Sequence, residues 1–111
     1  MNITVKTEAD VTILLPDGRL DWTTIAVFSS AIKQAIRLGA RKILLDFSLT
    51  DYMGSAGVRA MIDVMREVES AKGKLILCSL NDNLKELFHI VQFDKVFTIF
   101  EKDSEALDAF Q

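Results

Sequence analysis

The sequence predicts an α/β fold with a mixed, mostly parallel sheet, an N-terminal hairpin and about four helices. Near the start, apolar and polar residues alternate with the period of two that is typical of strands, at Ile3 and Val5 and then at Val11, Ile13 and Leu15. Farther along, short apolar runs alternate with segments of helical spacing. Strands separated by helices require right-handed crossovers, so we expect a largely parallel sheet after one antiparallel pair.

The first part of the chain contains the hairpin and one long helix. The hairpin turns at Glu8-Ala9-Asp10, and Pro16-Asp17-Gly18 is expected to end its second strand. The helix that follows is expected to close at Gly39, which suits the left-handed cap position. Its apolar face is formed by Ile25, Phe28, Ile32, Ala35 and Ile36.

The rest of the chain alternates strands and helices, which completes the order β-β-α-β-α-β-α-β-α. The helix over 55–70 is expected to pack on the sheet through Val58, Met61, Ile62 and Met65. The next short helix carries Leu84, Leu87, Phe88 and Val91, and Asn81 or Asp82 can cap it. The other elements are strands over 43–46, 74–79 and 96–100 and a terminal helix from Asp103 or Ser104 to near Phe110.

Composition predicts a single domain over residues 1–111 with a substantial core, since half of the residues are apolar. The lone Cys78 has no internal disulfide partner and is expected to be a buried, reduced thiol. The net charge of −3 and the absence of a basic run argue against nucleic-acid binding. We find no signal-peptide pattern and no apolar stretch of membrane-spanning length, so we expect a cytoplasmic protein.

Enzyme motifs are missing from the sequence. The one histidine, His89, lies beside the apolar stripe of its helix and is expected to be a surface residue. Metal-ligand spacing, a Walker loop, a dinucleotide-binding glycine motif and a Gly-x-Ser-x-Gly elbow are all absent. The sequence therefore predicts a protein that is not an enzyme and that needs no metal or cofactor.

The most informative segment is Asp46–Val58, which joins a buried strand to an amphipathic helix. Ser55 lies where the loop becomes a helix, beside unpaired backbone N–H groups and the positive end of the helix dipole. Such a position favours a phosphate, although a helix-starting serine among small residues is also explained by packing and capping. Asp46 and Ser48 are expected to bond the loop backbone and so hold the loop that presents Ser55.

This segment resembles the signature of STAS domains, the fold of bacterial anti-sigma-factor antagonists. The likeness is carried by the strand, Asp46-x-Ser48, the Met53-Gly54-Ser55-Ala56-Gly57-Val58 string and the amphipathic helix, and it extends through Phe97–Phe100. In that family the serine after the Met-Asp or Met-Gly pair is phosphorylated, and by resemblance this is Ser55. Many antagonists have aspartate at the position of Gly54, so this chain lacks one negative charge next to Ser55.

The resemblance implies an anti-sigma-factor antagonist in a partner-switching circuit that regulates transcription. Such an antagonist binds an anti-sigma factor, itself a serine kinase, and frees a sigma factor. Phosphorylation of the serine releases the complex, and a metal-dependent phosphatase of the PP2C type reverses the modification. ATP would then be bound by the kinase and not by this chain. Weak nucleotide binding stays open, as do two other STAS roles: a regulatory subunit of a lipid-transport ABC complex, and a nucleotide- or lipid-binding module.

The partner surface is expected around Ser55. Gly18–Asp21 resembles a Gly-x-Leu-Asp segment that lies beside the phosphoserine loop in antagonists, while Asp21 or Thr23 is also a natural helix cap. Trp22 is either half-buried packing or an exposed anchor, and the sequence leaves both open. The residues expected to contact a partner are Asp21, Trp22, Thr23, Met53, Gly54, Ser55, Ala56 and Arg59, and those expected to shape the loop are Asp46, Ser48 and Gly57.

Overall fold

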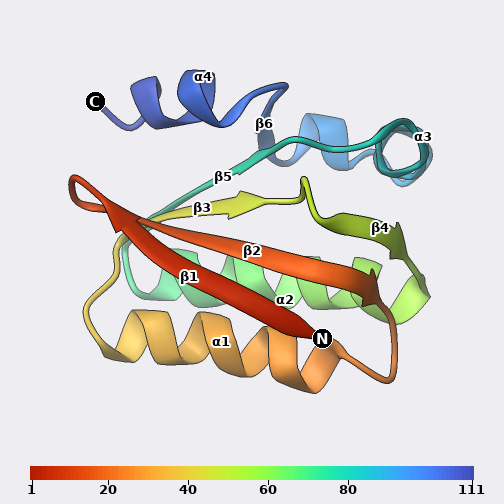
Figure 1. Cartoon of the computed structure of the whole chain (residues 1–111), viewed down its shortest axis with the longest axis horizontal. Coiled ribbons are helices and arrows are strands. Elements are labelled where there is room, and N and C mark those ends of the chain that lie inside the picture. Colours follow the sequence, from red (N-terminus) through yellow and green to blue (C-terminus); the bar gives the residue numbers. More distant parts are fainter.

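The computed structural model describes residues 1–111 and contains one six-stranded mixed sheet with four helices (Figure 1). The elements are β1 (Asn2–Glu8), β2 (Val11–Leu20), α1 (Ile25–Arg37), β3 (Lys42–Asp46), β4 (Thr50–Met53), α2 (Ser55–Ser70), β5 (Lys74–Cys78), α3 (Asp82–Ile90), the 3-10 turn η1 (Phe93–Lys95), β6 (Thr98–Phe100) and α4 (Asp103–Asp108).

The strands lie in the order β1-β2-β3-β5-β6, and β4 pairs with the far end of β2. Only β1 and β2 are antiparallel, and the other four pairs are parallel. The predicted α/β class with a hairpin at the start is therefore confirmed. The helix count agrees as well, and each crossover carries one helix between parallel strands.

The second strand does not end at Pro16-Asp17-Gly18, as the turn residues had suggested, but continues to Leu20. Gly18 has a φ of +105°, and the pairing with β4 changes register between Gly18 and Arg19. This irregularity bends the strand without ending it. Two hydrogen bonds hold the bend to residues 49–50, which lie just before and at the start of β4. The Thr50 hydroxyl donates to the Pro16 carbonyl at 2.7 Å, and the Gly18 N–H donates to the Leu49 carbonyl at 2.9 Å.

The strand β4 lies in the segment that the sequence predicts as a loop before Ser55. The two middle residues are exposed and the two ends are buried, so the segment lacks the alternation that indicates a strand. Its pairing with β2 places Tyr52 opposite Arg19 and Met53 opposite Leu20. The chain therefore enters α2 from a strand held in register with the end of β2.

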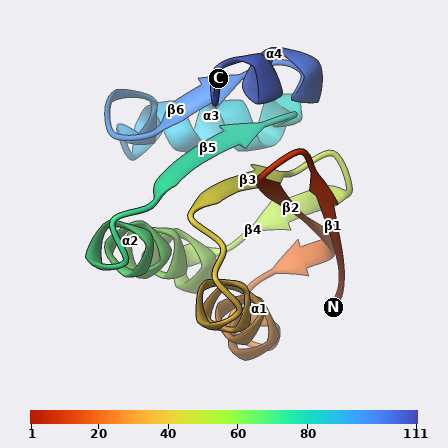
Figure 2. The same ribbon diagram turned by 90° about the vertical axis from the view of Figure 1, so that its left-hand side faces the viewer.

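The core has two parts, one on each face of the sheet, because neighbouring strand residues point to opposite faces. Leu45 belongs to the larger part, under α1, α2 and α3, whereas its neighbour Leu44 belongs to the smaller part, under α4. Figure 2 shows α1 and α2 side by side beneath the strands and α4 above them. The smaller part is made by Val11, Ile13, Leu44, Ile76, Cys78, Ala106 and Phe110.

The buried face of α2 differs in part from the predicted one. Met61 is fully buried as expected, but Val58, Ile62 and Met65 are only half-buried and flank the contact. The prediction followed the large apolar side chains, whereas the face centres on a line that begins with two small residues and so lets the helix approach the sheet closely. The buried residues are Gly57, Ala60, Met61, Val64 and Val68.

The remaining elements agree with expectation apart from their ends. Asn81 caps α3, since its side-chain oxygen accepts a hydrogen bond from the Leu84 N–H at 2.8 Å. The last strand is shorter than predicted because η1 and the buried Phe97 occupy the segment before it. Cys78 is a buried free thiol, and burial raises its pKa to about 11.

Candidate functional site

Ser55 is the exposed first residue of α2, directly after β4. The residue before it, Gly54, is the N-cap, with φ −89° and ψ −178°, and no side chain caps the helix. The Gly54 N–H donates to the Leu20 carbonyl at 2.9 Å, and the Gly54 carbonyl accepts from the Val58 N–H at 3.0 Å. The hydroxyl of Ser55 therefore lies at the positive end of a 16-residue helix whose start is fixed against β2.

Gly57 is required for this close approach of α2 to β2. A Cβ atom at this position would lie 2.6 Å from the Leu20 carbonyl oxygen and 2.7 Å from Cγ of Met53. The first distance involves backbone that cannot rotate away. The absence of a side chain at Gly57 therefore lets the first turn of α2 lie close to the end of β2.

The last two residues of β2 and the turn that follows at residues 21–24 lie beside Ser55 and form one unit, the 19–24 turn. The Asp21 carboxylate accepts hydrogen bonds from the Thr23 hydroxyl and from its N–H at 2.9 Å. These bonds, with a smaller contribution from Arg19 at 3.4 Å, hold the pKa of Asp21 below its ordinary value. The Thr24 hydroxyl closes the turn by donating to the Arg19 carbonyl at 2.8 Å.

The predicted capping role of Asp21 or Thr23 is wrong in detail. The helix α1 begins at Ile25 and its N-cap is Thr24, which makes no side-chain capping bond. The Asp21 carbonyl instead accepts from the N–H groups of Thr24 and Ile25, at 3.0 Å each. The Asp21 carboxylate therefore stabilises the turn that lies directly before α1 and does not cap the helix itself. This turn fixes the backbone on both sides of Trp22.

Trp22 is an exposed side chain, which excludes half-buried packing, one of the two readings that the sequence leaves open. Its exposed fraction is 79%, the largest among the exposed large apolar side chains. Asp21 and Thr23 on either side are bonded to each other, so a large aromatic surface is presented on an ordered turn. Tryptophan in such a position is typical of residues that dominate the binding energy of protein interfaces.

Arg19 and Tyr52 join this turn to the loop before Ser55. The guanidinium carbon of Arg19 lies 4.1 Å from the centre of the Tyr52 ring, within cation–π range. A Cβ at Gly54 would lie 3.5 Å from the Tyr52 hydroxyl and 3.6 Å from Cβ of Asp21, which is ordinary contact distance. Nothing in the sequence pattern pointed to Arg19 and Tyr52, because they meet only through the unforeseen pairing of β2 with β4.

Two further polar contacts support the loop. Asp46 is buried, with 6% exposed, and its carboxylate accepts from the Ser48 N–H at 2.9 Å, as an Asx turn requires. The Ser48 hydroxyl, which is also expected to bond the loop backbone, makes no such hydrogen bond, and Ser48 takes part through its N–H alone. The side-chain amide of Asn81 donates to the Thr50 carbonyl at 3.3 Å while its oxygen caps α3. Asn81 therefore ties the start of α3 to the strand that leads into Ser55. The sequence indicated its capping role but not this second contact.

Ser55 lies between two hollows in the surface. The first, of about 620 Å³, is mostly apolar and lies between the start of α2 and α3, with the buried Met53 in its wall. Its lining residues are Tyr52, Met53, Gly54, Ser55, Val58, Asn83, Leu84, Leu87 and Val91. The second, of about 420 Å³, lies between α1 and α2 and is lined by Ile25, Ser29, Ser55, Ala56, Arg59, Ala60 and Asp63.

His89 is an exposed residue of α3, and its Nδ1 atom lies 3.0 Å from the Asp94 carboxylate. Histidine, cysteine, aspartate and glutamate side chains nowhere form a group of three that could hold a metal ion. The helices are all too short or too polar to cross a membrane.

The family model of the STAS domain matches residues 2–106, which is nearly the whole chain. The chain belongs to the STAS domain family. Its six-stranded mixed sheet with four helices is the STAS fold, and the Ser55 loop lies where β4 passes into α2.

Similar STAS proteins are anti-sigma factor antagonists by name. BtrV of Bordetella bronchiseptica is 33% identical over 73 residues, which are 66% of this chain and 63% of BtrV, so the match spans less than two thirds of that protein. The crystal structure of a Thermotoga maritima antagonist has a TM-score of 0.90 at 22% identity and covers 96% of this chain and 92% of that one. SpoIIAA in its unphosphorylated form has a TM-score of 0.74 at 24% identity, over 98% and 97% of the two chains.

The STAS structure brings most of the predicted site residues to one end of α2. Asp21, Trp22, Thr23, Gly54, Ser55, Ala56 and Arg59 belong to the 19–24 turn and the first turns of α2. Met53 is the exception, because only 4% of it is exposed and its side chain packs in the core beneath the loop. The space at Gly54 also accommodates a side chain, so the glycine found there is not imposed by packing.

Proposed function

We propose that this STAS protein is an anti-sigma factor antagonist in a cytoplasmic partner-switching circuit, with Ser55 as its phosphoacceptor. In the unphosphorylated state it binds an anti-sigma factor that is a serine kinase, and phosphorylation of Ser55 releases it. A PP2C-type phosphatase then restores the binding form. In this circuit the chain is a ligand and a substrate, and the catalysis belongs to its partners.

The observation that carries the proposal is the exposed Ser55 hydroxyl on the uncapped first residue of α2. An acceptor hydroxyl must be reached by the kinase, and here it lies outside the core on an ordered backbone. Phosphate is also compatible with this position, since a helix N-terminus favours an anion by roughly 0.3–1 kcal/mol. The names of the similar proteins, anti-sigma factor antagonists, support the same circuit.

The partner surface is proposed to consist of the 19–24 turn, which carries Trp22, and the apolar hollow between α2 and α3 on whose edge Ser55 lies. Trp22 supplies an exposed aromatic anchor, with Asp21 and Thr23 beside it. The hollow, with Val58 and Leu87 among its apolar lining residues, offers a place for an apolar side chain of the partner. Ser55 lies on the rim of this hollow, so a phosphoryl group would stand inside the interface.

Phosphorylation is proposed to act on the interface and not on the fold. A phosphoserine adds about −1.5 to −2 charges at pH 7. Asp21 and Asp51 are acidic residues near this end of the molecule, and a partner matched to them gains little from further negative charge. Asp46, on the loop that leads to Ser55, is buried and takes no part in this contrast.

The acceptor assignment is tested by peptide mapping after incubation with an anti-sigma factor kinase and ATP. We expect the label on Ser55 and its loss in Ser55→Ala. Ser48 is an exposed competitor on the same segment, whereas Thr50 is 2% exposed and its hydroxyl is bonded to Pro16. Undiminished labelling of Ser55→Ala would refute the assignment.

The switch is tested by titrating variants against the same kinase, with thermal melts in parallel. Ser55→Asp should keep the melting temperature of the parent and bind much more weakly, and Ser55→Ala should bind and resist release. Ser48→Asp is the matched control, because it places a carboxylate on the same exposed segment away from the helix start. If Ser55→Asp binds as tightly as Ser48→Asp, the switch is not electrostatic. Protein phosphorylated by the kinase should bind as weakly as Ser55→Asp.

A further inference from the structure

Arg59 lies one helical turn after Ser55 on α2. Residues four apart on a helix have Cβ atoms about 5–6 Å from each other, so the two side chains can meet. Both line the same hollow of about 420 Å³ between α1 and α2. Arg59 is exposed, and none of the ion pairs of the molecule includes it. Its guanidinium is therefore a cation without a partner beside the proposed acceptor.

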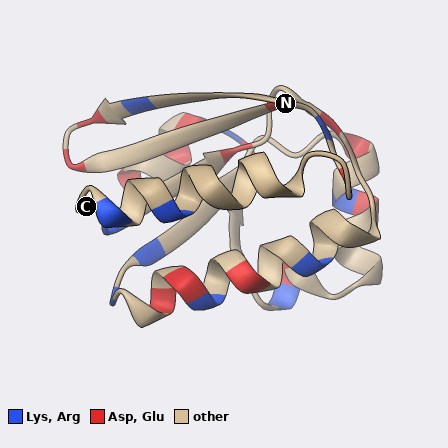
Figure 3. Ribbon diagram, turned by 90° about the horizontal axis from the view of Figure 1, so that it is seen from below, with Lys and Arg blue, Asp and Glu red and all other residues tan.

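The charges around this hollow leave Arg59 as its only cation. On α2 the one other charged residue of the lining is Asp63, which lies a further turn along and does not pair with Arg59. From α1 the lining residues are Ile25 and Ser29, neither of which is charged. Figure 3 shows both signs of charge along α2 and only basic positions on α1. The 19–24 turn brings Asp21 near Gly54, with its carboxylate already bonded by Thr23 and Arg19.

We propose that Arg59 binds the phosphoryl group once Ser55 is phosphorylated. A guanidinium donates two parallel, charge-assisted hydrogen bonds to a phosphate, which makes arginine well suited to this contact. Gly54 favours the pairing further. It lies between Ser55 and the 19–24 turn, and it has no carboxylate next to the phosphoryl group. The inference rests on the proposed phosphorylation of Ser55 and specifies its local consequence.

The pairing changes the partner surface in two ways at once. In the unphosphorylated protein Arg59 is free at the start of α2 and available to an acidic group of the kinase. In the phosphorylated protein the same guanidinium is held by the phosphoryl group of its own helix. Modification of Ser55 therefore adds negative charge and withdraws a cation, with no change in the fold.

The test uses full-length protein with phosphoserine encoded at position 55 during synthesis, so that no kinase is needed. Phosphorus NMR over a pH series measures the pKa of the phosphoserine in the parent and in Arg59→Gln. We expect the pKa to be higher by about half a unit in Arg59→Gln, because an exposed ion pair with Arg59 favours the dianion in the parent. The difference should shrink in about 1 M NaCl, where charges are screened within about 3 Å.

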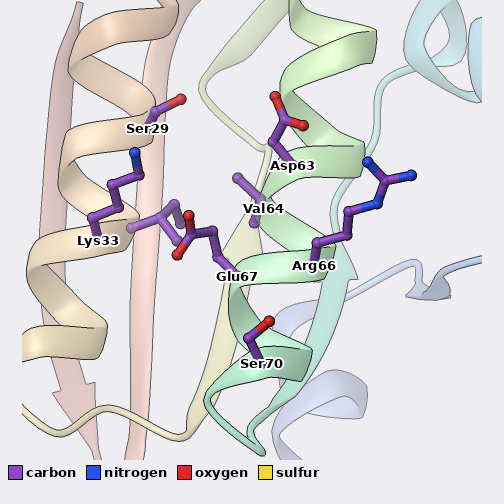
Figure 4. Close-up of a pocket in the computed structure, with 8 residues that line it drawn as sticks. Ser29, Lys33, Asp63, Val64, Arg66, Glu67 and Ser70 are labelled. Atoms are coloured by element: carbon purple, nitrogen blue, oxygen red, sulfur yellow. The ribbon is translucent and has the colours of Figure 1, made fainter.

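Arg66→Gln is the matched control, since Arg66 is another exposed arginine of α2 and its side chain extends away from α1 (Figure 4). Its phosphoserine pKa should equal that of the parent, and amide spectra of all forms check that the fold is kept. Equal pKa values in Arg59→Gln and Arg66→Gln would overturn the inference. A kinase that labels another residue would refute the proposed function alone, because the encoded phosphoserine does not depend on it.

Discussion

Replacing Gly57 by alanine should destabilise the protein, although the same change in most helices is stabilising. The new Cβ would lie 2.6 Å from the Leu20 carbonyl oxygen and 2.7 Å from Cγ of Met53. Met53 can shift, but the carbonyl is backbone and also accepts a hydrogen bond from Gly54. Overpacking of this kind costs about 1–3 kcal/mol, and the better helix propensity of alanine offsets at most about 1 kcal/mol.

Because the backbone carbonyl cannot move aside as a side chain can, we take the upper part of the overpacking range, about 2–3 kcal/mol, and expect a net loss of about 1–2 kcal/mol. At roughly 4–8 °C for each kcal/mol in a domain of about this size, the melting temperature should fall by roughly 4–16 °C. Urea and thermal denaturation followed by circular dichroism measure both quantities. Gly54→Ala is the matched control, because its Cβ would meet nothing closer than 3.5 Å and its backbone suits any residue, so its stability should change by no more than about 0.5 kcal/mol. If Gly57→Ala is as stable as Gly54→Ala, the close contact between α2 and β2 does not position Ser55.

Three further changes test other parts of the structure. Met61→Ala should cost about 2–5 kcal/mol in urea denaturation because Met61 is fully buried, and a smaller loss for Met61→Ala than for the half-buried Ile62→Ala would contradict the observed face of α2. Gly54→Asp should add a capping carboxylate to α2 and raise the free energy of unfolding by up to about 1 kcal/mol. A melting temperature of Gly54→Asp below that of the parent, with both measured at high salt, would exclude this. Burial raises the pKa of Cys78 from 9.0 to about 11, so the stability that this thiol contributes is complete below pH 9 and lost as the pH rises to about 11; the decline over that range should be smaller in Cys78→Ala.

The parts of the structure that could be predicted depend on local signals. Ser55 follows Gly54 at the point where apolar spacing changes from the strand period to the helix period, and the structure starts α2 there. Asp46 and Ser48 are two residues apart, which suffices for an Asx turn whatever the tertiary structure. The α/β class follows from the alternation of such segments along the chain, and the STAS resemblance followed from their order.

The parts that could not be predicted depend on contacts between distant segments. Arg19 and Tyr52 meet because β4 pairs with the bent end of β2, and neither the bend at Gly18 nor the strand has a pattern that reveals it. Asn81 could be recognised as a cap, but its bond to the Thr50 carbonyl requires α3 to lie beside β4. The buried face of α2 differs from the predicted one for the same kind of reason, since side-chain size alone does not show where a helix lies closest to the sheet.

The two faces of the sheet differ in how strongly they are covered, and this difference has a consequence for local unfolding. One face is covered by α1, α2 and α3, and the other by the six-residue α4. Detaching α4 exposes only a small part of the core, so it requires far less free energy than global unfolding. Cys78 lies in that part of the core, next to residues of α4. The rate at which a thiol reagent labels Cys78 therefore reports the opening of α4, on the face of the sheet opposite to the helix that presents Ser55.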